Sequence, residues 1–212
     1  MALYDVKPKF RQLLSRLLPW LEPIHPDVLT WGALACSIAS AILLSCAYRH
    51  RWLLLVIPLL LFARIALNAL DGLLAQATGK ARPFGEVLNE ATDRLADMAI
   101  LFGIAYSPFS SIRWGAPAIA AVFFSSYVGI LGKAVGAGRQ YGGLFGKADR
   151  MLWFGLACVS VYFFGNATLF RIPRGPSVEL LDGLLALFAP MACVTSIQRV
   201  CRIHEILSGR KP

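Results

Sequence analysis

Charged residues are scarce in this sequence: only 16% of its 212 residues are Asp, Glu, Lys or Arg, whereas 57% are hydrophobic. A soluble domain of this length does not need so much apolar surface, so the composition favours a polytopic membrane protein. Acidic residues are rarer than basic ones, and the formal net charge is +9. Because the basic residues lie in short clusters between apolar runs, they indicate a membrane partner and no nucleic acid.

Several other features are missing as well. The five cysteines stand singly in or beside apolar segments, without the spacing of a zinc or redox pair. We therefore interpret them as small buried hydrophobic residues. Internal repeats and low-complexity segments are absent from the sequence. The N-terminal segment lacks the apolar core and the small-residue cleavage site of a signal peptide, so we expect no cleavable signal.

Apolar runs dominate the rest of the chain and predict an all-α polytopic fold. Residues 4–22 alternate apolar and basic positions, which predicts an amphipathic helix on the anionic cytoplasmic leaflet, with a solvated tail as the alternative. The expected organisation is an amphipathic N-terminal helix at 1–26, a six-helix transmembrane domain at 27–202 and a cytoplasmic tail at 203–212. Six segments are long enough to span a bilayer: 28–48, 52–76, 86–107, 114–136, 151–170 and 179–200.

The distribution of Lys and Arg predicts the orientation. If the N-terminus is cytoplasmic, most of these residues, Arg199 and Arg202 among them, fall on the cytoplasmic side. This bias predicts that both termini and the candidate site face the cytoplasm. Arg64 and Arg94 fall inside predicted spans, so each needs a polar partner or a cavity. The opposite side holds only Arg49, Arg51, Arg113, Arg171 and Arg174.

Polar residues recur inside the second and third predicted spans, where few are tolerated. Asn68 and Asp71 are three residues apart and share a helix face. Carboxylate and amide oxygens suit Mg²⁺ or Mn²⁺, which commonly bridge phosphates. The alternative is a set of interhelical hydrogen bonds and ion pairs, such as Glu90 with Arg94. In the third span the residues that share one face follow at intervals of four: Gly85, Asn89, Asp93 and Asp97.

This spacing resembles the signature of the CDP-alcohol phosphotransferases, also called CDP-alcohol phosphatidyltransferases. The family pattern is D-x2-D-G-x2-A-R-x8-G-x3-D-x3-D. The segment "HPDVLT" at residues 25–30 is similar to the family's P-N-x-L-T entry into the first span. The chain is most similar to a bacterial branch whose motif begins with Asn and continues through G-x-x-L-N-E. The sequence itself reads Asn68-x2-Asp71-Gly72-x2-Ala75-Gln76-x8-Gly85-x3-Asn89-x3-Asp93.

The resemblance implies a homodimeric, multi-pass enzyme of phospholipid biosynthesis in the bacterial inner membrane. Such enzymes move a phosphatidyl or related phosphoalcohol group from a CDP-linked donor, CDP-diacylglycerol or a related CDP-alcohol, to an acceptor alcohol and release CMP. Gly72, Ala75 and Gly85 would line the CDP site, and Asp93 would also be the general base. By position, the metal ligands would be Asn68, Asp71, Asn89 and Asp93.

Three positions depart from the family pattern. Asn68 and Asn89 replace family aspartates, and Gln76 replaces the family arginine. Asparagine can still bind a metal through its carbonyl oxygen, but two negative charges are lost, which weakens metal affinity. The site then holds one or two Mg²⁺ or Mn²⁺ ions, helped by Asp97 or Glu90 or by the substrate diphosphate, or it has lost activity.

The sequence leaves these outcomes open. The alternative to an enzyme is a degenerate family member that acts as a lipid- or CDP-binding partner protein. A transporter would also explain intramembrane acids, but no inverted repeat or interrupted helix pair supports one.

A second polar cluster lies in the glycine-rich segment 132–150. By analogy with the family, its residues Arg139, Lys147 and Arg150 would bind the phosphate of the acceptor, a phosphorylated polyol such as glycerol 3-phosphate or inositol phosphate. Asp149 beside Arg150 suggests a local ion pair, which favours an ordered binding site. The alternative is a positive-inside loop that touches lipid headgroups.

Overall fold

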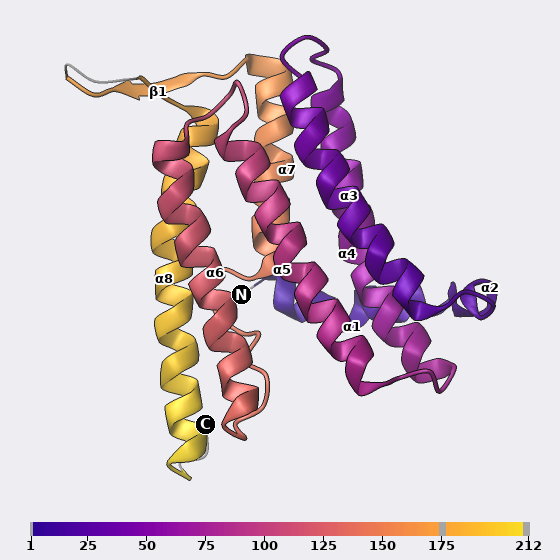
Figure 1. Ribbon diagram of the computed structural model, residues 1–212. Helices are drawn as coiled ribbons and strands as arrows, with labels where there is room; N and C mark the ends of the chain where they lie inside the picture. The colour runs from indigo at the N-terminus through magenta and orange to yellow at the C-terminus, as the bar shows by residue number, and fades with distance from the viewer. Residues whose placement is uncertain (1, 174–176, 210–212) are drawn as a thin grey trace. The chain divides into compact units, whose positions relative to one another are not determined.

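The structure is a computed structural model that describes residues 2–173 and 177–209. It divides into two compact units, Met1–Gly103 and Ile104–Pro212. Arg174, Arg210 and Lys211, which contribute to the predicted charge asymmetry, lie outside the described residues. Within the described residues the fold is mostly helical, and Figure 1 labels its elements.

The first unit contains the N-terminal helices and the predicted first, second and third spans. In it α3 and α4 lie side by side (Figure 1). Gly103 lets α5 approach α3 closely, since a Cβ there would lie 2.6 Å from that of Ala41. The bounds are α1 (Ala2–Ser15), α2 (Leu18–Leu21), α3 (Pro26–Cys46), α4 (Leu53–Ala77) and α5 (Pro83–Ala105).

The predicted N-terminal amphipathic helix is present but interrupted. It consists of α1 and α2, separated by Arg16 and Leu17. Leu14 is buried against the core that includes Leu70 and Leu74 of α4, and the Phe10 ring meets Phe62 edge-on at 5.9 Å. One apolar face of α1 therefore packs on α4, whereas exposed Leu13, Leu17 and Trp20 remain available to lipid.

The second unit contains the predicted fourth, fifth and sixth spans. In it α6 and α8 run side by side (Figure 1). The rings of Phe145 and Phe188 pack edge to face, with their centroids 4.9 Å apart. This contact anchors the end of the glycine-rich segment in the hydrophobic core. The bounds are α6 (Ile112–Ala134), α7 (Lys147–Phe164), β1 (Thr168–Arg171), β2 (Ser177–Glu179) and α8 (Leu180–Leu207).

The prediction of an all-α fold is wrong at residues 168–171 and 177–179, where β1 and β2 pair antiparallel with Thr168 opposite Glu179. The fifth helix was predicted to continue to residue 170 but ends at Phe164. It ends there because Gly165 adopts φ +80°, which a residue with a side chain rarely adopts. The helix also begins earlier than predicted, since the Asp149 carboxylate accepts a 2.8 Å hydrogen bond from the Gly146 N–H.

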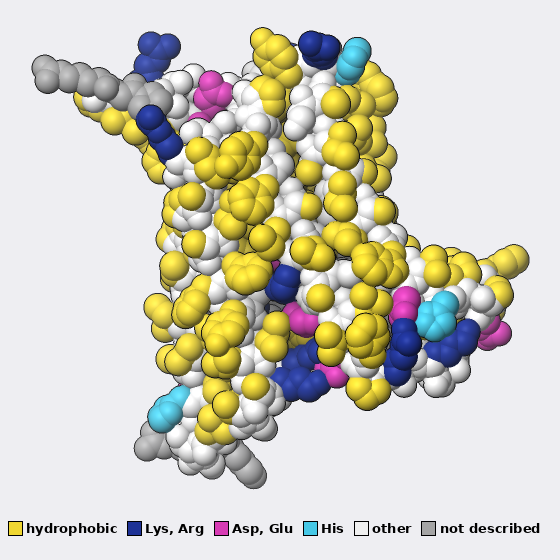
Figure 2. Space-filling view, viewed as in Figure 1, with side chains coloured by type: hydrophobic (Ala, Val, Ile, Leu, Met, Phe, Trp, Pro, Cys, Tyr) yellow, Lys and Arg dark blue, Asp and Glu magenta, His cyan; other side chains and the backbone are white. Residues whose placement is uncertain are grey.

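Each of the six predicted spans corresponds to one helix, from α3 to α8. Among the described helices, α3, α4, α6 and α8 are long and apolar enough to cross a membrane by length and composition. The other two have a higher density of charged residues: α5 carries five among 23 residues and α7 three among 18. Hydrophobic side chains cover most of the helix surface visible in Figure 2, as lipid contact requires. The chain is a multi-pass membrane protein.

Candidate active site

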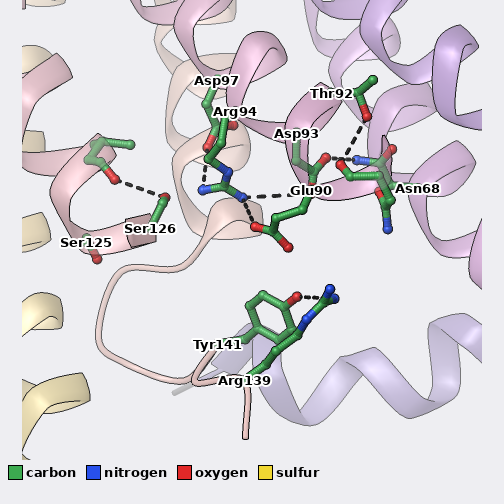
Figure 3. Close-up of polar contacts among 12 residues, drawn as sticks. Asn68, Glu90, Thr92, Asp93, Arg94, Asp97, Ser125, Ser126, Arg139 and Tyr141 are labelled. Atoms are coloured by element: carbon green, nitrogen blue, oxygen red, sulfur yellow. Dashed lines mark hydrogen bonds and ion pairs between the residues drawn. The ribbon is translucent and has the colours of Figure 1, made fainter. Parts of the chain in front are cut away.

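Two of the predicted site residues meet between α4 and α5. The Asn68 side-chain amide donates a 2.7 Å hydrogen bond to Oδ1 of Asp93 (Figure 3). The Asp93 side chain is only 18% exposed. In this arrangement the amide nitrogen of Asn68 faces the carboxylate of Asp93, so it holds that carboxylate in place.

Asp71 is held by a residue of α3. Its carboxyl oxygen Oδ2 accepts a 2.8 Å hydrogen bond from the Thr30 hydroxyl, and both side chains are buried. Thr30 is the last residue of the "HPDVLT" segment that resembles the family's entry motif. We did not predict this role of Thr30, because the sequence placed Thr30 at the start of a span without indicating which residue it faces.

The small residues of the signature leave space beside the acids. A Cβ added at Gly72 would meet no atom within 4 Å, so the helix face next to Asp71 is open. A Cβ at Gly85, in the first turn of α5, would meet only the flexible side chain of Arg82, at 3.3 Å. Oδ1 of Asn89 is buried, and no hydrogen-bond donor within the described residues reaches it. The unused amide oxygen suits a bound cation, and the open face leaves space for the group that such a cation would bridge.

The remaining charges of α4 and α5 form ion pairs. Arg64 is fully buried and donates to Oδ1 of Asp97 at 2.5 Å. Arg94 lies 3.2 Å from Glu90, 3.9 Å from Asp97 and 4.0 Å from Asp93 (Figure 3). The predictions that each intramembrane arginine has a polar partner and that Glu90 pairs with Arg94 are therefore confirmed.

Asp97 and Glu90, suggested as additional metal ligands, instead neutralise arginines. Consistent with this, the described part of the chain contains no group of three or more His, Cys, Asp or Glu side chains arranged for a metal ion. A cation at this site would therefore need amide as well as carboxylate oxygens.

In the second unit, Arg199 of α8 organises the glycine-rich segment. It is 8% exposed, and its guanidinium donates to the carbonyl oxygens of Ser125 at 2.6 Å, Gly142 at 3.0 Å and Tyr141 at 3.3 Å. We had predicted Arg199 only as a cytoplasmic topology signal. The sequence does not indicate that Arg199 is buried, because apolar residues lie on several faces of α8 and no single buried face can be identified.

Other contacts fasten the same segment to α6 and α8. Gln198 and Thr195 accept hydrogen bonds from the N–H groups of Leu144 at 2.8 Å and Phe145 at 3.1 Å. A Cβ at Gly129 or Gly132 of α6 would lie 2.7 Å from a carbonyl oxygen of the segment, so both glycines are required for this approach. These contacts give the glycine-rich segment a defined loop conformation.

The predicted acceptor-binding residues lie on or beside this loop. The Arg139 guanidinium donates a 2.7 Å hydrogen bond to the Tyr141 hydroxyl and lies 5.7 Å from the centre of its ring. Lys147 and Arg150 lie in the first turn of α7, and Arg150 is 4% exposed. Asp149 caps that helix. Whether the three cations bind one phosphate remains a prediction.

Comparisons with known proteins identify the family. No family model matches the chain. It is 35% identical over 166 residues to the inner membrane protein YnbA of Escherichia coli, which covers 77% of this chain and 82% of the relative. It is also 34% identical over 155 residues to the archaetidylinositol phosphate synthase of Pyrococcus horikoshii, covering 71% and 78%. The phosphatidylinositol phosphate synthase of Cutibacterium acnes is 28% identical over 86% of both chains. The chain therefore belongs to the CDP-alcohol phosphatidyltransferase family.

Solved structures share the fold. The Mycobacterium tuberculosis phosphatidylinositol phosphate synthase with CDP-DAG bound superposes with a TM-score of 0.68 at 21% identity, covering 91% of this chain and 94% of that one. The same enzyme in complex with manganese and citrate gives a TM-score of 0.66 at 22% identity, covering 92% and 88%. The chain therefore shares the fold of these solved structures.

Proposed function

We propose that the chain is a divalent-metal-dependent CDP-alcohol phosphatidyltransferase. It transfers the phosphatidyl group of CDP-diacylglycerol to a phosphorylated polyol and releases CMP. The observation that carries this proposal is the pairing of α4 and α5 through Asn68 and Asp93, beside the open face at Gly72, in a chain of this family.

The residues are assigned by their place in the signature and by their surroundings. Asp71, oriented by Thr30, and Asp93, oriented by Asn68, supply the carboxylate oxygens. Gly72, Ala75 and Gly85 line the site of the donor diphosphate. A divalent cation bound to Asp71, Asp93 and the amide oxygens of Asn68 and Asn89 would neutralise charge on the diphosphate.

The transfer needs one displacement at phosphorus. The acceptor hydroxyl oxygen bonds to the phosphorus that carries the lipid, the bond from that phosphorus to the bridging oxygen breaks, and its electron pair leaves with CMP. The hydroxyl proton passes to the carboxylate of Asp93, which acts as general base. The hydrogen bond from Asn68 orients that carboxylate before the acceptor arrives.

The acceptor is proposed to be phosphorylated, with Arg139, Lys147 and Arg150 binding its phosphate. Two relatives are named as synthases of inositol phosphate lipids, which supports inositol phosphate as the first acceptor to test and glycerol 3-phosphate as the second. The protein is proposed to reside in a bacterial inner membrane as a homodimer, with both termini and the site on the cytoplasmic side, as the distribution of Lys and Arg predicts.

One observation favours a second candidate. Asn68, Asn89 and Gln76 depart from the family signature at positions that carry charge, which would suit a catalytically inactive protein that binds CDP-diacylglycerol for a partner. The retained Asp71, Gly72, Gly85 and Asp93 favour the enzyme, because a binding partner does not require a general base.

CMP release by the purified protein tests the proposal. The assay supplies CDP-diacylglycerol, Mg²⁺ or Mn²⁺, and inositol phosphate, glycerol 3-phosphate or neither. We expect metal-dependent release that requires one acceptor and falls by roughly 10²-fold or more in Asp93→Asn, since a general base contributes about that much. Binding of CDP-diacylglycerol without release for either acceptor would instead support the inactive binding partner.

A further inference from the structure

We propose that Arg82, held beside Gly85 by an ion pair with Asp27, binds the diphosphate of the CDP-linked donor. The inference rests on the proposed function and adds a residue to its donor site. It follows from side-chain contacts that join the start of α3 to the start of α5, two helix ends that lie at the same end of the first unit (Figure 1).

The connection between α4 and α5, residues 78–82, brings two cations towards the proposed donor site. They are Lys80 and Arg82. The Lys80 ammonium group donates to the backbone carbonyl oxygen of Glu22, at 3.4 Å, and so reaches towards the end of α2. Arg82 is therefore the cation of this connection that lies next to Gly85.

The Arg82 side chain lies against the glycine that is proposed to line the donor site. A Cβ added at Gly85 would lie 3.3 Å from Cγ of Arg82 and 3.9 Å from its Nε. The guanidinium carbon also lies 5.6 Å from the centre of the Phe84 ring. Because the Arg82 side chain is 46% exposed, a ligand beside Gly85 can reach it. A guanidinium binds phosphate oxygens through parallel N–H groups, and the uncharged Gln76 leaves the family's arginine position without one.

Asp27 fixes the direction of this guanidinium, which donates to its carboxyl oxygen Oδ2. Asp27 lies three residues before Thr30, so both residues share one face of α3. On that face Thr30 donates to Asp71 of α4. The segment that enters α3 thus orients a carboxylate and a cation of the proposed donor site. Asp27 acts through Arg82 and is a positioning residue.

Stability does not explain this ion pair. The Arg82 and Asp27 side chains are 46% and 25% exposed, and pairs at such exposure contribute little to folding because water screens their charges. Variants at both positions should therefore fold. Their effect on the donor site can then be measured directly.

Calorimetric titration of the purified protein with CDP, in detergent and with Mg²⁺, tests the inference without turnover. In Arg82→Gln the dissociation constant for CDP should rise roughly tenfold or more, since charge-assisted hydrogen bonds are lost. Lys80→Gln is the matched control, because it removes a cation from the same connection and should leave CDP binding nearly unchanged. Thermal unfolding checks that both variants are folded.

A parallel titration with CDP-diacylglycerol distinguishes the donor diphosphate from a lipid headgroup. CDP has no lipid tails, so a loss of affinity for CDP in Arg82→Gln arises at the nucleotide. We expect the same fold-change for both ligands. A loss for CDP-diacylglycerol without a loss for CDP would place Arg82 at lipid and overturn the inference.

Variants of Asp27 test its positioning role. Asp27→Asn should weaken CDP binding by a smaller factor than Arg82→Gln, because the cation remains nearby. Asp27→Glu keeps the carboxylate and should recover most of the affinity. The exchange of Asp27→Arg with Arg82→Asp keeps an ion pair but reverses it, so we expect normal thermal unfolding with weak CDP binding. Wild-type affinity in the exchanged protein would mean that the pair only holds the helices together.

The outcomes separate this inference from the proposed function. Weaker CDP binding in Arg82→Gln but not in Lys80→Gln supports the inference, whether or not the protein releases CMP. Unchanged CDP binding in Arg82→Gln, together with CMP release by the wild type, would overturn it and leave the enzyme standing. Equal losses in the two variants would also overturn it, because net charge would then govern binding. A wild-type protein that binds no CDP would overturn it as well, and CMP release in that preparation would decide whether the enzyme survives.

Discussion

At the scale of residues, the unusual residues within the spans divide into those that packing or charge neutralisation explains and those that neither explains. Arg64 and Asp97 neutralise each other, and removing either partner from such a buried pair typically costs about 3–5 kcal/mol. Gly72 differs, because nothing in its surroundings requires the absence of a side chain. A residue that packing does not explain is the one for which a function is needed.

Replacing Gly72 with Ala separates stability from function. Because the added Cβ meets open space and glycine is a poor helix former, Gly72→Ala should raise the free energy of unfolding by about 0.5–1 kcal/mol. CMP release should nevertheless fall at least tenfold if the donor diphosphate occupies that space. Thermal unfolding in detergent and the CMP assay measure the two effects.

Gly103→Ala is the matched control for this prediction. Its Cβ would lie 2.6 Å from the Cβ of Ala41, so the variant should be destabilised. A Gly72→Ala protein that keeps full activity would show that the face beside Asp71 is not the diphosphate site.

At the scale of elements, the conformation of the glycine-rich loop is imposed by the helices beside it. Its carbonyl oxygens approach the glycines of α6, and its carbonyl and N–H groups are bound by Arg199, Gln198 and Thr195 of α8. Arg139 and Tyr141 are presented from this fixed loop. A loop that only marked membrane topology would need its charges but not these contacts.

Arg199→Ala should therefore disturb the acceptor site while leaving the donor site intact. Three carbonyl oxygens lose a charged donor, and each charge-assisted hydrogen bond contributes about 1.5–3 kcal/mol. We expect KM for the phosphorylated acceptor to rise tenfold or more, with little change in KM for CDP-diacylglycerol. Steady-state kinetics of CMP release, with each substrate varied in turn, measures both constants.

Arg171→Ala is the control, because Arg171 is an exposed arginine of β1 in the same unit, whereas Arg202 of α8 lies against Gly142 of the loop. An equal effect of both variants would mean that net charge, and not the contacts of Arg199, governs the acceptor site.

At the scale of the whole molecule, the chain is a multi-pass membrane protein. Its orientation in the membrane is predicted from the distribution of its basic residues. Basic residues cluster at the N-terminus, in the segments after α4 and α6 and at the end of α8, and they are sparse in the other connections. The negative surface of the cytoplasmic leaflet attracts the richer side. Both termini are therefore expected on the cytoplasmic side.

Reporter fusions in Escherichia coli test this orientation. Green fluorescent protein fused after the last residue should fluoresce, since it folds in the cytoplasm. Alkaline phosphatase fused after Arg113, in the first turn of α6, should be active, since it requires the periplasm. The reverse pattern would contradict the predicted orientation and move the site to the other side of the membrane.

The sequence predicted most of the helical fold and the position of the polar stripe on two of its helices. Long apolar runs with basic flanks located the spans to within a few residues, because helix formation in lipid depends on local composition. The exceptions are the end of the fifth helix, at Phe164 instead of 170, and the end of the sixth, which continues from the predicted 200 to Leu207 and so into the predicted tail. The strand pair β1 and β2 was not predicted, because exposed apolar residues of β1 such as Leu169 and Phe170 resemble the end of a span. Spacing alone also placed Asn68 and Asp71 on one face of a helix, since helical periodicity is local.

The partners of these residues were decided only by the tertiary structure. Thr30 lies 41 positions from Asp71, and Arg199 lies 74 positions from Ser125, so no periodicity relates them. The same holds for Asp97, which could have served a metal but is neutralised by Arg64 from another helix. Composition and spacing determined that this protein is a membrane bundle with an acidic and amide stripe. Which of these acids pair with arginines was determined by helix packing, because packing brings side chains from different helices into contact.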